Sequence, residues 1–499
     1  MIEFICEFHL TLKNKFKQMK KLFYIQLLFF VLSTSLSAKK IKKKVKSTNF
    51  IIILVDDMGY GDVGYHGALD MMTPNIDKLA SEGTYFTQGY VNCSVCGPSR
   101  AGLISGRYPA KFGINGNFGA NAKNGFPNDQ PMLQDMLKEA GYKTGAVGKW
   151  HFGHAKEEFK PWKRNFDFFY GFLVGGHGYF WADTTYNAKK DNWPIYRNSE
   201  IVKYKRGDYL TDKFNEEAVG FIERNHDEPF FLYLAYNAVH YPWSVSENYL
   251  ERVDANREHH FKYRRILAGM TLAIDDGVGE IMKTLEKHGI DENTAIFFLS
   301  DNGAPATIAG PTAINTGDHI MSKTNGLRGY KGDTYEGGIR VPFLVKWPEE
   351  VPAGKSYIEP VISIDIVPTI TEYLGLQAPE TGYDGVNLLP YLKGENKQSP
   401  HDYMYWRYQD DYAYRKGDWK LTWNDQEKVF HMTKDKVLDK KEIKPKLFNL
   451  KNDPYERHDM KEVYPDKYNE LLEEFNAMDS QMSDAGLFKV PFNRVSGVE

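Results

Sequence analysis

The sequence predicts an α/β fold, with a large mixed, mostly parallel sheet flanked by helices and a smaller C-terminal α+β domain carrying an antiparallel sheet. Apolar runs without alternation are typical of strands that are buried on both faces. Helical patterns separate these runs along the chain, which favours parallel strands. After about residue 395 the pattern changes to short alternating segments, which favours the antiparallel sheet.

Four apolar runs are the predicted core strands, at residues 50–55, 144–147, 229–235 and 295–299. Polar residues follow each run; they are Asp56 and Asp57, Lys149 and His151, Asn237 and His240, and Asp301 and Asn302. Parallel sheets bind ligands beyond the carboxyl ends of their strands. We therefore expect these polar residues to converge on one site.

The predicted helices lie between these strands, at residues 73–83, 133–141 and 266–289. Thr73 and Pro74 begin the first helix, and a glycine ends each of the three. Residues 159–209 and 303–325 have no clear period and are interpreted as insertions over the strand ends. In the C-terminal part we expect strands at 403–406 and 419–423 and a helix at 465–482.

The N-terminus has the pattern of an export signal. Lys20 and Lys21 precede the apolar run 22–32, and small residues follow up to Ala38. We predict a signal peptide at 1–38, with Met19 as a possible true start, and a Lys-rich leader at 39–48. The apolar run is short for a bilayer, although an anchor helix is the alternative interpretation. These features predict a secreted or periplasmic protein without a stable membrane span.

Composition excludes several other classes of protein. In 499 residues, 63 Lys and Arg face 66 Asp and Glu, so there is no basic excess of the kind that nucleic-acid binding requires. Three cysteines cannot form a disulfide scaffold. An apolar share of 42% in a chain of this length is sufficient for a large core.

Three ordered motifs point to one family. Cys96 opens a Cys-x-Pro-Ser-Arg string, a Gly-Tyr-Lys-Thr string at 141–144 leads to Gly-Lys-Trp-His at 148–151, and a third motif spans 327–342. Together they resemble the type I sulfatases, which are formylglycine-dependent, calcium-binding members of the alkaline phosphatase superfamily. The resemblance runs from about residue 50 to 389 and is weaker at 447–454. Ser105 departs from it, since the family favours Thr, Ala or Arg there.

This resemblance implies an alkaline phosphatase-like fold, a catalytic sulfatase domain at 49–394, a C-terminal subdomain at 395–499, and sulfuric ester hydrolase activity. It also implies that a formylglycine-generating maturation enzyme oxidises Cys96. A thiol would attack sulfur poorly, whereas a hydrated aldehyde has one hydroxyl that attacks and another that drives release. From the residues alone, Cys96 is either a buried apolar residue or the partner of Cys93 in a disulfide, and the disulfide is favoured because an exported chain could oxidise the pair.

Asp56, Asp57, Asp301 and Asn302 form the all-oxygen ligand set that hard cations such as Ca²⁺ prefer. The resemblance implies that they bind one calcium ion together with an oxygen of the modified Cys96. On the residues alone, each Asp is also a common cap of a helix or turn.

The resemblance also assigns roles to basic residues. Arg100 orients the hydrated aldehyde, and Lys149 and Lys331 hold sulfate oxygens. His240 protonates the leaving alcohol with help from Lys331, and His151 accepts the proton of the second hydroxyl. Taken singly, a histidine or lysine is more often structural or solvated.

Weaker predictions concern substrate contacts. His154 and His177 are further candidate substrate-binding residues, and Asp301 is expected to assist deprotonation of the nucleophile. Four tryptophans are candidates for stacking on sugar rings, and packing in the core or at the surface is the alternative interpretation for each. They are Trp162, Trp181, Trp193 and Trp243.

The predicted function is therefore hydrolysis of sulfate esters on a sulfated carbohydrate. One alternative is a phosphodiesterase or phosphonate monoester hydrolase of the same superfamily. Two-metal phosphatases need more Asp and His ligands than these strand ends offer. Another alternative is a catalytically inactive sugar-binding relative.

Overall fold

The computed structural model describes residues 17, 48–119, 121–180, 194–202, 207–256, 262–305, 322–424 and 444–482. The chain forms two compact units, residues 1–46 and residues 47–499, and a single residue of the first is described. The predicted signal peptide and leader therefore lie almost entirely outside the described residues. Within the described part of the chain, no helix has the length and apolar character that a membrane crossing needs.

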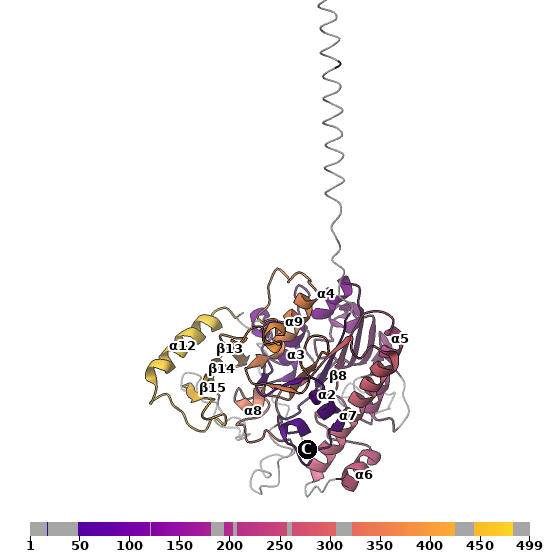
Figure 1. Cartoon of the computed structure of the whole chain (residues 1–499), viewed down its shortest axis with the longest axis horizontal. Coiled ribbons are helices and arrows are strands. Elements are labelled where there is room, and N and C mark those ends of the chain that lie inside the picture. The colour runs from indigo at the N-terminus through magenta and orange to yellow at the C-terminus, as the bar shows by residue number, and fades with distance from the viewer. Residues whose placement is uncertain are drawn as a thin grey trace, which may run out of the picture. The chain divides into compact units, whose positions relative to one another are not determined.

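The second unit contains the helices and strands that are labelled in Figure 1. It is built on a ten-stranded sheet with the order β11-β2-β10-β9-β1-β8-β4-β5-β6-β7. Its strands are β1 (Asn49–Val55), β2 (Thr84–Phe86), β4 (Lys143–Lys149), β5 (Phe168–Phe172), β6 (Tyr196–Arg197), β7 (Glu200–Ile201), β8 (Phe230–Ala235), β9 (Thr294–Ser300), β10 (Phe343–Lys346) and β11 (Lys355–Tyr357). The five central strands β9, β1, β8, β4 and β5 are parallel, and β10 and β6 run antiparallel to their neighbours. The predicted mixed, mostly parallel sheet is confirmed.

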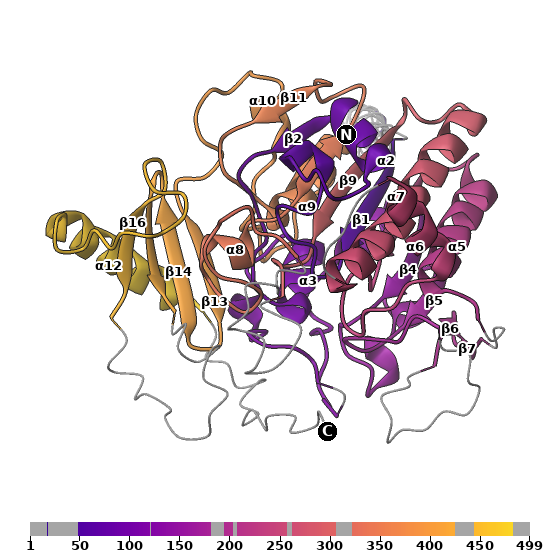
Figure 2. The ribbon, with the colours of Figure 1, turned by 90° about the horizontal axis from the view of Figure 1, so that it is seen from below.

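Helices surround the sheets of the second unit. The longer ones are α2 (Pro74–Ser81), α3 (Cys96–Ser105), α4 (Leu133–Glu139), α5 (Leu210–Asn225), α6 (Glu247–Asn256), α7 (Lys262–His288), α9 (Ile366–Tyr373) and α12 (Pro465–Asp479), and the short ones are α8 (Glu336–Ile339) and α10 (Leu389–Leu392). Figure 2 shows α5, α6 and α7 together on one side of the sheet. A two-stranded sheet pairs β3 (Gly89–Tyr90) with β12 (Val361–Ile362).

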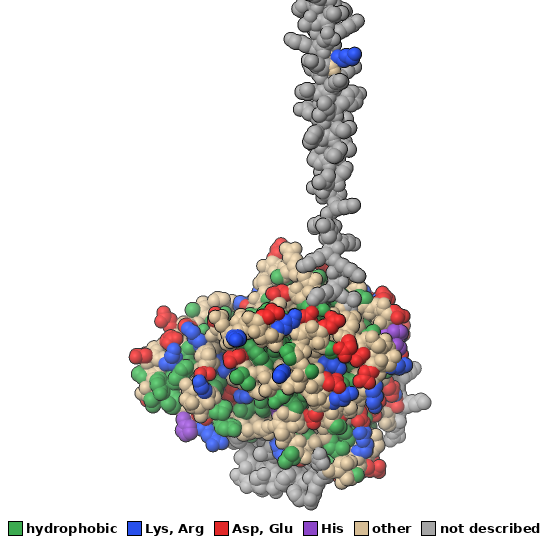
Figure 3. Space-filling model, viewed as in Figure 1, with side chains coloured by type: hydrophobic (Ala, Val, Ile, Leu, Met, Phe, Trp, Pro, Cys, Tyr) green, Lys and Arg blue, Asp and Glu red, His purple; other side chains and the backbone are tan. Residues whose placement is uncertain are grey.

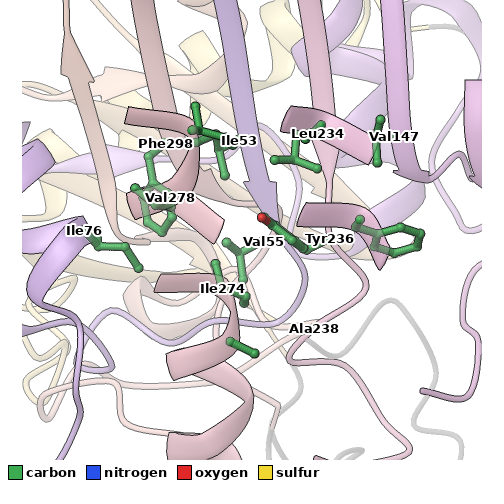
Figure 4. Close-up of a cluster of buried hydrophobic side chains, with 14 of the residues drawn as sticks. Ile53, Val55, Ile76, Val147, Leu234, Tyr236, Ala238, Ile274, Val278 and Phe298 are labelled. Carbon is green, nitrogen blue, oxygen red and sulfur yellow. The ribbon is translucent and has the colours of Figure 1, made fainter. Parts of the chain in front are cut away.

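The central strands are buried on both faces. Ile53 and Val55 of β1 belong to the main hydrophobic cluster, and Figure 4 shows Val55 beside Ile274 of α7 and Ile53 beside Phe298 of β9. On the other face, the ring of Phe50 meets Trp347 edge-on, with ring centroids 5.4 Å apart. Side chains alternate across a strand, so an unbroken apolar run fills both layers, as its sequence predicted.

The C-terminal part carries a separate antiparallel sheet of β13 (Met404–Tyr408), β14 (Asp411–Lys416), β15 (Trp419–Trp423) and β16 (Lys446–Asn449). Helix α12 packs on it, with the Phe475 ring centroid 4.2 Å from that of Trp423. The predicted antiparallel sheet is confirmed, and the helix ends at Asp479, before the predicted Met482. The domain boundary at 394 stays a prediction.

One segment differs from the sequence interpretation. Residues 159–209 were expected to form an insertion, yet β5 within them is a strand of the main sheet, parallel to β4. Its Gly171 pairs with Gly148, and a Cβ at Gly171 would lie 1.9 Å from the Gly148 carbonyl oxygen. Glycine at this position lets the backbones of β4 and β5 approach closely. Because glycine is uncommon inside strands, the sequence pattern did not predict β5.

The surface has no dominant sign of charge on the face shown in Figure 3, where Lys and Arg lie among Asp and Glu. This agrees with the formal net charge of −3.

Candidate active site

The carboxyl ends of four parallel strands meet at one edge of the main sheet. In the register of β1 and β9, Val55 lies opposite Ser300, so the residues that follow both strands are neighbours. The Asp301 amide donates to the Val55 carbonyl at 2.8 Å, and the Asp56 amide donates to the Ala238 carbonyl at 3.0 Å. The strand ends thus bring together segments that lie far apart in the sequence.

The acidic residues form a compact oxygen-rich cluster. The Asp57 amide donates to Asp301 Oδ1 at 3.3 Å, and Asn302 Nδ2 donates to Asp57 Oδ1 at 2.7 Å. Ligand atoms of Asp56, Cys96 and Asp301 all lie within 4.8 Å of one another. Such a group of atoms is close enough to share one metal ion.

Two observations test whether this cluster fits a hard cation. Asp56 Oδ1 and Asn302 Oδ1 are buried and accept no hydrogen bond from any described residue. Burial and repulsion from Asp301 raise the pKa of Asp56 to about 7. A divalent cation would satisfy the oxygens and relieve the repulsion, and the donors are the type that Ca²⁺ prefers. The residues therefore fit such an ion.

Each carboxylate of the cluster also faces a cationic side chain. Arg100 Nε donates to Asp301 Oδ2 at 2.8 Å, and Lys149 Nζ donates to Asp56 Oδ2 at 2.5 Å. Both cationic side chains are fully buried with their partners. Burying a charged group costs less free energy when a group of opposite charge lies close to it. The acidic and basic side chains therefore stabilise one another in these positions.

Lys331 completes the basic set from another part of the chain. Its Nζ donates to Asp57 Oδ1 at 2.5 Å. Burial would lower the pKa of Lys331, but the combined effect of Asp57, Cys96 and the other carboxylates of the site outweighs burial and raises that pKa. The Lys331 amide donates to the Ala304 carbonyl at 2.7 Å, and the Gly332 amide donates to the Ser94 carbonyl at 2.9 Å. These bonds fix Lys331 between the end of β9 and the turn before Cys96.

Cys96 is the first residue of α3, at its N-terminus, and is 2% exposed. Burial raises the pKa of its thiol, although Lys149 and Lys331 oppose the shift. Cys93 and Cys96 are both free, so the disulfide considered as an alternative is not formed. The Cys93 thiol instead donates to the Arg407 carbonyl at 3.4 Å.

His151 follows β4 and is buried with φ of 58°, a left-handed conformation that is uncommon outside glycine. Its Nε2 lies 3.3 Å from the Phe118 carbonyl, and its Nδ1 has no hydrogen-bond partner among the described residues. Burial, followed by Lys149 and Arg100, lowers the pKa of His151 well below its usual value. The ring is therefore neutral near pH 7 and able to accept a proton.

His240 lies across the site from His151. Its Nε2 is 3.8 Å from Asp57 Oδ2, and its Nδ1 is 2.6 Å from the Tyr241 carbonyl. Burial and the nearby Lys331 lower the pKa of His240 to about 4, although Asp57 opposes the shift. An anionic ligand beside this ring would raise the pKa again, because it stabilises the protonated form.

A glycine-rich segment separates the two histidines. A Cβ at Gly175 would lie 2.9 Å from His151 Nε2, and a Cβ at Gly176 would lie 3.4 Å from His240 Cε1. The Tyr179 hydroxyl then lies 2.6 Å from the Asn237 carbonyl, beneath the turn that carries His240. The segment thus fits closely against both rings and supports them.

The weaker candidates lie in less direct positions. His177 is 4% exposed and packs on Phe172, with ring centroids 5.1 Å apart, so it has a structural position behind the His240 turn. His154 is partly exposed. Trp162 packs against Tyr196 at 5.4 Å, whereas Trp181 and Trp193 lie outside the described residues. Substrate contacts by His154 and His177 stay predictions.

Asn117 is a site residue that the sequence analysis missed. Its Oδ1 accepts a hydrogen bond from the Gly97 amide at 2.8 Å and lies 3.7 Å from Cys96 Sγ. The same loop contacts the antiparallel sheet, because the Gln409 amide donates to the Asn115 carbonyl at 3.2 Å. No motif marks Asn117; a polar, Gly-rich loop soon after the Cys96 string is the only signal in the sequence.

A mixed sheet with an acidic cluster, buried cations and two histidines at the ends of its parallel strands defines the class as an alkaline phosphatase-like hydrolase of anionic esters. A family model described as Sulfatase matches residues 48–376, and one described as N-sulphoglucosamine sulphohydrolase, C-terminal, matches residues 330–484. The chain belongs to the sulfatase family and is a sulfuric ester hydrolase. The resemblance that the motifs indicated is confirmed.

Individual relatives agree with this assignment. The chain is 32% identical over 462 residues to N-acetylgalactosamine-6-sulfatase of Mus musculus, covering 85% of this chain and 84% of the relative. It is 30% identical over 430 residues to steryl-sulfatase of Homo sapiens, covering 72% and 71%. The crystal structure of Ps i-CgsB is 35% identical, has a TM-score of 0.77, and covers 88% of this chain and 94% of its own.

Proposed function

We propose that this sulfatase is exported and removes sulfate from a sulfated carbohydrate, an oligosaccharide or polysaccharide, using formylglycine made from Cys96 and one calcium ion. The observation that carries the proposal is the position of Cys96 at the N-terminus of α3, within 4.8 Å of ligand atoms of Asp56 and Asp301. A relative named for N-acetylgalactosamine 6-sulfate and a similar structure solved with k-i-k-neocarrahexaose support the sugar.

Asp56, Asp57, Asp301 and Asn302 would hold the calcium ion, because their oxygens face one another at the strand ends. When bound, the ion supplies positive charge that stabilises an anionic ester and its attacking oxygen. Arg100 and Lys149 keep Asp301 and Asp56 in position through their buried pairs. These pairs keep both carboxylates in positions from which they would bind the ion.

Conversion of Cys96 to formylglycine supplies a hydrated aldehyde with two hydroxyls, of which one attacks sulfur and the other drives release. The conversion needs a formylglycine-generating maturation enzyme as a partner. Arg100 would orient the hydrate, since its side chain enters the cluster from the helix that Cys96 begins.

The remaining roles follow from the positions of the basic groups. Lys149 and Lys331 would hold sulfate oxygens, and Asp301 would assist deprotonation of the nucleophile. Neutral His151 would accept the proton of the second hydroxyl. His240, protonated beside the bound anion, would donate a proton to the leaving sugar oxygen with help from Lys331.

The test is release of inorganic sulfate from a panel of defined sulfated oligosaccharides, with phosphate monoesters and diesters assayed in parallel. We expect sulfate release by the wild type and none by Cys96→Ala. Intact-mass measurement after native expression should show Cys96 as aldehyde rather than thiol. Absence of sulfate release from every sugar, or faster turnover of phosphate esters, would contradict the proposal.

A further inference from the structure

Three aromatic side chains form a row that begins directly beside His240. Tyr241 follows His240 in the chain and is 61% exposed, and Tyr263 at the start of α7 is 42% exposed. The ring centroids of Tyr241 and Trp243 are 5.2 Å apart, and those of Trp243 and Tyr263 are 6.2 Å apart. Adjacent rings meet edge to face, at 81° and 69°, so the row is stepped rather than flat.

The row is anchored to the main body at its centre. Trp243 is partly buried and packs against the main hydrophobic cluster, whereas Tyr241 and Tyr263 expose their rings to solvent. The Tyr241 carbonyl contacts His240 Nδ1 at 2.6 Å, so the first ring is tied through its own backbone to a site residue. Its large exposed ring contributes little to the core, and exposed apolar groups that are clustered commonly mark a binding surface.

The chemistry of the row suits sugars. Aromatic rings provide rigid apolar area, and the hydroxyl of a tyrosine supplies a hydrogen-bonding group beside it. Pyranose rings have C–H faces and hydroxyl edges that match such a surface. The ammonium group of Lys262 lies 5.9 Å from the Tyr263 ring centroid, which places a positive charge at the far end of the row. That charge is complementary to a sulfated chain.

We propose that Tyr241, Trp243 and Tyr263 form a subsite that binds the sugar rings adjacent to the sulfated residue of an oligosaccharide or polysaccharide. This subsite rests on the proposed function. It also extends that function, because the subsite would make the length of the sugar chain a determinant of substrate recognition. A sulfated monosaccharide would occupy the strand-end site alone, whereas a longer chain would also cover the aromatic row.

The test compares Tyr241→Ala, Tyr241→Phe and the wild type on the oligosaccharide that the panel shows to be desulfated fastest, on the sulfated monosaccharide cut from it, and on 4-nitrophenyl sulfate. For Tyr241→Ala we expect KM for the oligosaccharide to rise about threefold to tenfold, the effect of losing one aromatic contact. The two small substrates should be unaffected, and Tyr241→Phe should behave nearly as the wild type. Tyr464→Ala, which removes a 45% exposed ring that packs on Trp419 of the antiparallel sheet, is the matched control.

Equal losses on the small substrates and the oligosaccharide would overturn the subsite, because they would show that Tyr241 acts through His240. An unchanged KM for the oligosaccharide would overturn it as well. Calorimetric binding of k-i-k-neocarrahexaose and of a chondroitin 6-sulfate hexasaccharide to Cys96→Ala and to Cys96→Ala/Tyr241→Ala separates the two proposals. If the wild type releases no sulfate but the Tyr241→Ala change weakens binding of a probe, the proposed function is wrong and the proposed subsite is supported. If neither probe binds and no sugar is desulfated, both fail.

Discussion

Arg100 and Asp301 form a fully buried ion pair that joins α3 to the end of β9, with Arg100 Nε 2.8 Å from Asp301 Oδ2. A second guanidinium nitrogen lies at the same distance from that oxygen. Burial would lower the pKa of Arg100, but the combined effect of Asp301 and of neighbouring groups that include Asp56 outweighs burial and raises that pKa. The pair thus fixes the helix that begins with Cys96 against a strand end.

Truncation of this pair should destabilise the whole unit. Arg100→Ala would leave Asp301 buried without its partner, which costs about 3–5 kcal/mol in comparable pairs. Urea unfolding measures the change. Arg197→Ala is the control, because Arg197 pairs with Glu217 while 44% exposed, and such pairs contribute about 0–1 kcal/mol. If both variants lost a similar free energy of unfolding, the buried Arg100 pair would be no more stabilising than an exposed pair.

Calcium should stabilise the protein through the strand-end cluster. A ligand that binds only the folded state adds about 2.7 kcal/mol at a free concentration 100 times its Kd. We expect added Ca²⁺ to raise the thermal unfolding midpoint and excess chelator to lower it. Asp57→Ala should lose most of this response, and Asp276→Asn, which changes a partly exposed carboxylate paired with Arg252, should keep it. A response that Asp57→Ala leaves intact would place the ion elsewhere.

Asn117 should affect turnover through the position of Cys96. Asn117→Ala leaves the Gly97 amide without its acceptor at the start of α3, a loss worth about 0.5–2 kcal/mol at helix N-termini. We expect kcat to fall more than KM rises, because the nucleophile is displaced while Lys149 and Lys331, which are proposed to hold the sulfate, stay in place. Asn117→Asp keeps the acceptor, so it should restore the stability of the wild type but repel an anionic substrate and raise KM. If both variants match the wild type in kcat and KM, the contact has no functional role.

Much of this site was predictable because its residues follow local patterns. Asp56 and Asp301 come directly after apolar runs, and parallel strands place such residues at one edge. Cys96 and Lys331 came from motif resemblance, since no period in the sequence indicates that residue 331 reaches residue 57. Asn117 could not be predicted, because its position depends on how its loop folds over α3 and contacts Gln409. The substrate contact of His177 stays a prediction, and its side chain is 4% exposed and packs on Phe172.

A buried charge cluster near Lys331 should make stability depend on pH. Lys420 Nζ lies 2.9 Å from both Glu336 Oε1 and Glu456 Oε1. Arg340 and Arg415 also face Glu336, whereas Lys420 is the cation that faces Glu456. Burial, with repulsion from Glu336, therefore raises the pKa of Glu456 to about 7. The folded state then holds a proton that the unfolded state releases near pH 4.5, so this group lowers stability as pH rises from about 4.5 to 7.

Glu456→Gln should remove this loss of stability with rising pH. Relative to the wild type, its free energy of unfolding should improve between pH 5 and pH 8 by on the order of 1–3 kcal/mol. Urea titrations across this range provide the measurement. Glu474→Gln changes a partly exposed carboxylate near Lys416 and should leave the pH profile unchanged. An identical pH profile for Glu456→Gln and the wild type would show that both buried glutamates are ionised together.

The role of His240 as the acid can be separated from a binding role by varying the leaving group. A sugar alkoxide is a poor leaving group and needs a proton, whereas 4-nitrophenolate leaves readily without one. Loss of a general acid costs about 10²–10⁴-fold, so His240→Ala should lower kcat for sugar sulfates by this order and affect 4-nitrophenyl sulfate far less. Lys149→Ala serves as the contrast, because loss of a sulfate-binding charge should impair both substrates alike. Equal losses for both substrates in His240→Ala would assign the ring to binding, where its 3.8 Å approach to Asp57 would be a structural contact.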